Sequence, residues 1–247
     1  MVGFYTTLRF LGNLYCILTK VSSSVFYQYA YLLMTLVFLI IWLFIYLKRE
    51  DLRYGLLFAG VIVGFLSLVT AYLFWTVDWW QPPTFTNTRV GLEDFILGFT
   101  NGGIAVSLYD FIFNKRVVRT SNKHDLGGFT ILILFATSIS ALFWFLHLTS
   151  FWACTISLGL VGTLLTLLKP SLFINSLVNS VLMVVLVVPF YWVANMLFPF
   201  AVEEIYKFKT LSHTLLTGIP IEELIFYFIF GFVAPIFYKY WKGVEYI

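Results

Sequence analysis

The stretch IEELIFYFIFGFVAPIFY (Ile221–Tyr238) repeats, in altered form, an earlier stretch of the chain, LEDFILGFTNGGIAVSLY (Leu92–Tyr109). The two align without a gap at an offset of 129 residues, and six of the 18 positions are identical. An acidic pair opens each stretch: Glu93 and Asp94 in the first, Glu222 and Glu223 in the second. Membrane helices share an apolar composition, but chance seldom matches an acidic pair, so we interpret the two stretches as an internal duplication.

The composition is that of an integral membrane protein. Hydrophobic residues make up 61% of the chain, aromatic residues 21% and charged residues only 11%, whereas a soluble domain carries about 25% charged residues. The net charge of +3 is small, and we expect no nucleic-acid partner. Cys16 and Cys154 belong to no motif, and no Cys/His cluster suggests a metal.

Seven segments are apolar and long enough to cross a bilayer, which takes about 20 residues. They lie near 25–47, 54–76, 91–113, 128–149, 151–168, 172–198 and 218–241. Each should be a helix, because an open strand cannot satisfy its backbone groups in lipid. The sequence therefore predicts an all-α integral membrane protein with a single membrane domain over residues 1–247. Residues 1–20 resemble a short N-terminal segment more than a cleaved signal peptide.

The duplication predicts how the seven helices are organised. A first three-helix repeat would span 25–113, a linking helix 128–149, and a second three-helix repeat 151–241. The linking helix leaves the two repeats in the same orientation, so we expect a 3+1+3 parallel repeat.

The distribution of Lys and Arg predicts the orientation in the membrane. Ten of these residues fall on one side of the predicted helices and five on the other. The positive-inside rule places the first side in the cytoplasm, with the N-terminus outside the plasma membrane and the C-terminus inside. Both acidic pairs would then begin their helices at the outer side.

Two interpretations of the acidic pairs stay open. An acid near a helix N-terminus satisfies unpaired N–H groups and suits the helix dipole, which is worth about 0.3–1 kcal/mol. An acid that faces the interior of a helix bundle instead marks a functional site. A buried carboxyl beside a second one can keep its proton at neutral pH and act as a general acid.

Other side chains on the same helices could join such a site. Asn101 lies seven residues after Asp94 and shares its helix face. Aromatic residues are abundant in both stretches, and an aromatic face can stabilise a cation in a dry pocket by about 2 kcal/mol. An acid beside such faces suits the protonation of an alkene. Three asparagines in the sixth span are more simply explained as hydrogen-bonding partners between helices: Asn175, Asn179 and Asn195.

At these residues the chain resembles the membrane lycopene cyclase domain family, which comprises heterodimeric bacterial cyclases and fused archaeal and fungal domains. That family has two homologous three-helix halves, each with a Pro-x-Glu-Glu/Asp motif. Pro220, Glu222 and Glu223 match the second motif. In the first motif Gly91 stands where proline is expected, ahead of the matching Glu93–Asp94 pair.

The resemblance implies a redox-neutral cyclisation of the ends of lycopene or a similar acyclic carotene, an isomerisation that needs no cofactor. Glu222 or Glu93 would donate the proton, with Glu223 or Asp94 as partner or base, and the choice between the halves stays open. The expected partners are the carotenoid and membrane lipid, and the oligomeric state is open. The expected substrate contacts are Asn101, Phe99, Phe226, Phe228 and Pro220.

A different class of function competes with this one. The chain could be a carotenoid- or isoprenoid-binding membrane protein, or a small transporter, without catalysis. Acids along a water-filled path would favour transport, whereas acids in a dry, aromatic cavity would favour a cyclase. A glutamate intramembrane protease fits less well, because Tyr227 stands where that pattern has arginine. A retinal-binding receptor also fits less well, because Lys239 lies at the end of its helix.

Overall fold

The computed structural model describes residues 29–120, 124–198 and 201–246, so the predictions for residues 1–20 lie outside the described part. Within that part, the chain is mostly helical, and seven helices are long and apolar enough to cross a membrane, as the sequence predicted. The spans are Tyr29–Lys48, Glu50–Asp78, Leu92–Ile112, Asp125–Trp144, Ser150–Leu168, Pro170–Leu197 and Ile221–Lys242.

The spans are built from the following labelled elements. The second joins η1 (Glu50–Leu52), α2 (Arg53–Thr70), the π-helical turn η2 (Ala71–Trp75) and α3 (Thr76–Asp78). The later spans are α4 (Leu92–Ile112), α5 (Asp125–Trp144), α6 (Ser150–Leu168), η3 (Pro170–Leu172) with α7 (Phe173–Leu197), and α9 (Ile221–Lys242). The short elements are β1 (Val117–Arg119), α8 (Ala201–Ile205), η4 (Phe208–Thr210), β2 (Leu215–Leu216), β3 (Ile219–Pro220) and β4 (Val244–Tyr246).

Two predicted helix boundaries need correction. The fourth span ends at Trp144 rather than 149, and the chain turns through His147, whose φ is 53°. The last span begins at Ile221 rather than 218, because β3 pairs with β2 in an antiparallel hairpin just before it. Gly218 makes the turn of that hairpin possible, since its φ of 83° is unfavourable for any side chain.

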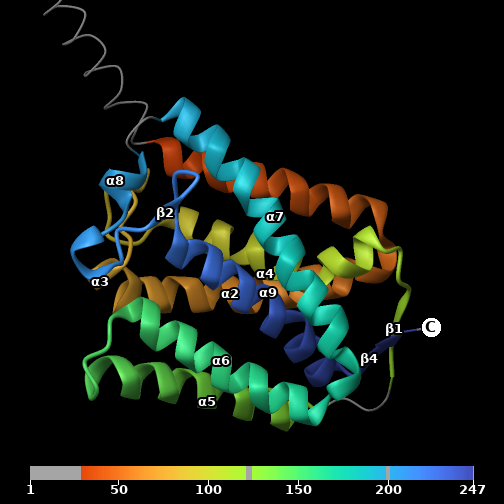
Figure 1. Cartoon of the computed structure of the whole chain (residues 1–247). Helices are drawn as coiled ribbons and strands as arrows, with labels where there is room; N and C mark the ends of the chain where they lie inside the picture. The colour runs from red at the N-terminus through yellow and green to blue at the C-terminus, as the bar shows by residue number, and fades with distance from the viewer. Residues whose placement is uncertain (1–28, 121–123, 199–200, 247) are drawn as a thin grey trace, which may run out of the picture.

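Helices α4 and α9 form the centre of the bundle. α9 contacts α4, α5, α6 and α7, and α4 also packs along α2. Figure 1 shows α2, α4 and α9 between the α5–α6 hairpin on one side and α7 with the Tyr29–Lys48 helix on the other. The two helices that begin with acidic pairs are therefore those that the rest of the bundle surrounds.

The crossing of α2 and α4 depends on small residues. A Cβ atom at Gly98 would lie 2.3 Å from Ser67 Oγ and 2.8 Å from the Val63 carbonyl oxygen. The hydroxyl of Ser67 donates to the Asp94 carbonyl oxygen at 2.6 Å. This close approach fixes the first turn of α4, and with it the first acidic pair, against α2.

The two ends of the bundle differ. At one end, here called the loop end, residues 79–91 meet residues 201–220, and Trp80 and Tyr206 form an isolated β-bridge. At the opposite end, here called the strand end, β1 pairs antiparallel with β4. Figure 1 shows α3, α8 and β2 at the loop end and β1, β4 and the C-terminus at the strand end. Since α4 and α9 both begin at the loop end, their acidic pairs lie there.

Candidate active site

The first acid of each pair accepts a hydrogen bond from the backbone of a loop at the loop end. Glu93 accepts a hydrogen bond at Oε1 from the backbone N–H of Phe85, and Glu222 accepts one at Oε1 from the backbone N–H of Ser212 at 2.7 Å. Both carboxyls are buried, and neither Oε2 atom has a hydrogen-bond partner among the described residues. The two halves thus use the same position in the same way.

The second acid of the first pair faces the interior. Asp94 is 4% exposed and accepts two hydrogen bonds, one at Oδ2 from the Gly91 backbone N–H at 2.8 Å and one at Oδ1 from the Tyr31 hydroxyl at 2.9 Å. The first of these caps α4, as the simpler interpretation of the acids predicted. The second joins Asp94 to the Tyr29–Lys48 helix, so this carboxyl also belongs to a buried contact between helices.

The second acid of the second pair lies among tyrosines. Glu223 is 7% exposed, and the hydroxyls of Tyr191, on α7, and Tyr206, after α8, lie beside its carboxyl. Those two hydroxyls are 2.6 Å apart and share a hydrogen bond. Burial, and then the nearby Glu223 carboxyl, raises the pKa of Tyr206 well above its ordinary value. Tyr206 is therefore a neutral phenol that can donate to or accept from its neighbours.

Asp94 and Glu223 line the same cavity. Its volume is about 190 Å³, and helices from both ends of the sequence contribute to its walls. The walls are mostly apolar, and the polar side chains among them include Tyr31, Asn101 and Tyr227. The sequence predicted that the acidic pairs of the two aligned stretches are equivalent, and the structure brings one acid from each pair to one cavity.

Aromatic rings surround the acids in this cavity. Phe226 makes edge-on contacts with Trp75 and Trp79, at 6.2 Å and 5.4 Å between ring centroids, and stacks on Phe230 at 5.7 Å. All four rings line the cavity. Trp75 belongs to the π-helical turn η2, and such turns are frequent at functional sites. Ring faces near a dry acid can stabilise a positive charge that develops on a hydrocarbon.

The predicted substrate contacts separate into two groups. Asn101 and Phe226 line the cavity, and Asn101 Nδ2 lies 3.4 Å from the Tyr227 hydroxyl oxygen. The other three predicted contacts are not among its lining residues. Phe99 packs between helices against Trp42 and Phe95, Phe228 is 38% exposed on the outer face of α9, and Pro220 is the N-cap of α9.

Several residues around the two acids were missed by sequence reasoning. Tyr31, Tyr191 and Tyr206 come from segments without any motif, and only their burial beside the acids singles them out. Tyr227 carried a usable signal, because it lies four residues after Glu223 and thus on the same helix face. Arg89 lies four residues before Glu93 in the sequence, and its Nε donates to Thr76 Oγ1 at 2.7 Å.

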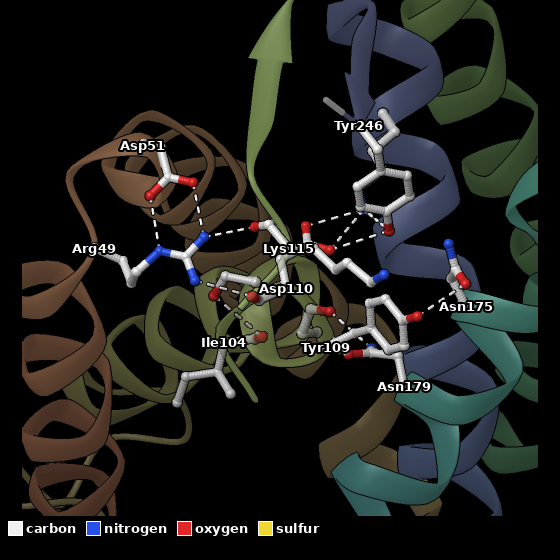
Figure 2. A network of polar contacts seen from close by, with 12 residues as sticks. Arg49, Asp51, Ile104, Tyr109, Asp110, Lys115, Asn175, Asn179 and Tyr246 are labelled. Carbon is white, nitrogen blue, oxygen red and sulfur yellow. Dashed lines mark hydrogen bonds and ion pairs between the residues drawn. The ribbon is translucent and has the colours of Figure 1, made fainter. Parts of the chain in front are cut away.

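A second polar network, at the strand end, joins the central helices away from the cavity. Asp110 and Lys239 form an ion pair at 2.9 Å between α4 and α9, with side chains only 2% and 4% exposed. The Tyr246 hydroxyl donates to Asp110 Oδ1 at 3.0 Å, and Figure 2 shows Arg49 and Tyr246 on either side of Asp110. Burial, and then the Asp110 carboxylate, raises the pKa of the Tyr246 phenol.

The asparagines of α7 act as partners between helices. Asn179 Nδ2 donates to the Ala105 and Gly231 carbonyl oxygens at 2.9 and 2.7 Å, and its Oδ1 accepts from the Tyr109 N–H at 3.0 Å. Asn175 accepts from the Tyr109 hydroxyl at 3.0 Å. The prediction that these side chains join helices is confirmed for Asn175 and Asn179, which connect α7 to α4 and, through Gly231, to α9.

Comparison with known proteins gives one match to a family model. The model described as lycopene cyclase matches residues 5–112 and 149–241, which is most of the chain. Comparison with curated proteins gives no match, and neither does comparison with solved structures. The matched segments contain both acidic pairs and all the helices that carry Asp94, Glu223 and the tyrosines around them. The chain therefore belongs to the lycopene cyclase family.

Proposed function

We propose that this protein cyclises the ends of an acyclic carotene such as lycopene by protonating a terminal double bond. One observation carries the proposal: the second acid of each pair, Asp94 and Glu223, lines a single apolar and aromatic cavity. Membership of the lycopene cyclase family supports the same reaction class. The substrate is a long hydrocarbon, which suits a cavity among lipid-embedded helices.

The surroundings of the two acids support different roles for them. Glu223 lies among neutral hydroxyls, so a protonated carboxyl there has acceptors for its proton and an apolar space in front of it. We assign it the role of proton donor. Asp94 accepts hydrogen bonds from Gly91 and Tyr31, an arrangement that suits a carboxylate, and we assign it the role of base.

The proposed reaction is an isomerisation. The Glu223 proton forms a C–H bond with a carbon of the terminal double bond, and a tertiary cation results. A neighbouring double bond attacks this cation and closes a six-membered ring, which moves the positive charge into the ring. Asp94 then removes a proton from a carbon next to the new cation, and a ring double bond forms. Aromatic rings such as Phe226 and Trp79 would stabilise the intermediates.

Glu93 and Glu222 have a supporting role in this proposal. Glu93 binds the backbone N–H of Phe85, and Glu222 binds the backbone N–H of Ser212, both in loops at the loop end. This revises the expectation that Glu93 or Glu222 is the donor, since neither is among the residues that line the cavity. Their role is to keep the loops over the cavity.

We also propose the 3+1+3 parallel repeat and the membrane orientation. Asp94 and Glu223 share one cavity, and Asp110 pairs with Lys239 at the same offset of 129 residues. The family match falls on either side of α5, the proposed linking helix. The excess of Lys and Arg at the strand end supports a cytoplasmic strand end and C-terminus and an outer loop end.

Expression in a bacterium that accumulates lycopene tests the function directly. Chromatography of the extracted pigments should show ring-containing carotenes with the wild-type protein, and unchanged lycopene with Glu223→Gln or Asp94→Asn. Immunoblots of washed membranes control for insertion. Unchanged lycopene with well-inserted wild-type protein would contradict the proposal and favour a protein that binds or transports an isoprenoid.

A further inference from the structure

The reaction proposed above moves a proton from one side of the cavity to the other in each cycle. Glu223 ends as a carboxylate and Asp94 as a carboxylic acid, although the substrate and product are isomers. The enzyme is ready for another ring only when Asp94 has lost its proton and Glu223 has gained one. Both carboxyls are buried, at 4% and 7% exposure, so the route of this proton is set by the groups around them.

Two tyrosines, Tyr31 and Tyr227, lie in the same cavity as the two acids. The Tyr31 hydroxyl donates to Asp94 Oδ1 at 2.9 Å. Tyr227 lies one helical turn after Glu223 on α9, so the two side chains share a helix face. All four side chains line the cavity and are less than 9% exposed.

The position of Tyr227 is further fixed by Asn101. Asn101 Nδ2 lies 3.4 Å from the Tyr227 hydroxyl oxygen, which directs this hydroxyl toward α4. In the first repeat, Gly98 stands at the position equivalent to Tyr227. A tyrosine at this position is therefore present in one half only, in the half that carries the proposed donor.

We propose that Tyr31 and Tyr227 return the proton from Asp94 to Glu223 within the protein, so that one proton serves successive ring closures. This inference rests on the proposed function. Each hydroxyl oxygen accepts a proton as it releases its own. Tyr31 thus receives a proton from Asp94, and Tyr227 passes another to Glu223. No co-reactant is consumed, and the residues end each cycle in their starting states.

Deuterium content of the product tests this route. Membranes that contain the full-length protein are equilibrated in D₂O buffer, given lycopene in liposomes, and the product is analysed by mass spectrometry after many turnovers. If each proton came from solvent, every ring would carry one deuterium. Internal return predicts deuterium in the first rings only, because later rings receive the hydrogen removed from the preceding substrate end. The average should fall well below one deuterium per ring.

Two variants test the residues. Tyr227→Phe and Tyr31→Phe each remove one hydroxyl, and each should slow turnover by about tenfold or more while raising the deuterium content toward one per ring. Tyr240→Phe is the control, because Tyr240 lies on the same helix but stacks on His124 and is not among the cavity residues. A purely structural effect would slow turnover without changing the isotope content.

The outcomes separate the inference from the function on which it rests. One deuterium per ring in the wild-type product overturns internal return and leaves the cyclase proposal intact. Low deuterium content that persists in both tyrosine variants overturns the assignment of Tyr31 and Tyr227. The wild-type measurement decides the route even if neither variant inserts. Absence of any cyclised product overturns the proposed function itself.

Discussion

Replacing Lys239 with methionine should destabilise the protein strongly. In the wild type, Lys239 Nζ lies 3.0 Å from Asp110 Oδ1 and 2.9 Å from Oδ2, and both side chains are almost fully buried. Lys239→Met keeps the volume of the side chain but leaves the Asp110 carboxylate without its cation. Only the Tyr246 hydroxyl then remains as a side-chain donor to Asp110 among the described contacts.

The expected loss follows from burial. Removing one partner of a buried ion pair costs about 3–5 kcal/mol, because the other charge stays buried without compensation. The double variant Lys239→Met, Asp110→Leu removes both charges, and it should recover most of that loss. Lys242→Met is a matched control, because Lys242 pairs with Asp125 at 2.8 Å where the side chains are 16% and 43% exposed. A partly exposed pair of this kind contributes less, about 1 kcal/mol.

Unfolding in mixed micelles of a mild detergent and increasing sodium dodecyl sulphate measures these differences as free energies. The expected order of stability is wild type, Lys242→Met, the double variant, and finally Lys239→Met. If Lys239→Met unfolds at the same point as Lys242→Met, the buried pair contributes nothing and the reasoning is refuted.

Three further changes test other parts of the structure. Asn179→Ala removes three hydrogen bonds to Ala105, Gly231 and Tyr109, so the same unfolding assay should record a loss of about 1–3 kcal/mol or more, and an unchanged stability would contradict the contact. Glu222→Gln keeps an acceptor for the Ser212 N–H and should still yield cyclised carotene, whereas loss of product together with normal stability would make Glu222 a chemical participant. The pKa of Tyr206 is raised in the folded protein. Its contribution to stability is therefore present below the ordinary phenol pKa of about 10 and is lost as pH rises through the folded value. Tyr206→Phe should lose less stability than the wild type between neutral and strongly alkaline pH, and parallel pH profiles of the two proteins would refute this.

The bundle and its central helices could be predicted from the sequence for a simple reason. Lipid permits only helices or closed barrels as spans, so hydropathy nearly determines the secondary structure. The repeated stretch then identified α4 and α9 as equivalent, and these are the two helices that the others surround. The hairpin of β2 and β3 was missed, because Leu215 and Leu216 are apolar residues next to a span and carry no signal that distinguishes a strand.

The candidate site was predicted only in part. The acidic pairs identified the two helices that carry the site and the end of each helix at which it lies. Two adjacent acids point about 100° apart on a helix, so spacing alone could not tell which acid faces inward. Packing decides this: Glu93 and Glu222 turn to loop backbones, while Asp94 and Glu223 turn to the cavity. Tyr31, Tyr191 and Tyr206 lie far from the motifs in the sequence, so their approach to the acids depends on the tertiary fold.

The most direct test of the central claim is the pigment profile of lycopene-accumulating cells that express Glu223→Gln beside cells that express Glu222→Gln, at equal amounts of inserted protein. The two side chains are neighbours in sequence, and only Glu223 lines the cavity. We expect unchanged lycopene with Glu223→Gln and cyclised carotene with Glu222→Gln. Cyclised carotene at the wild-type level from Glu223→Gln would contradict the account.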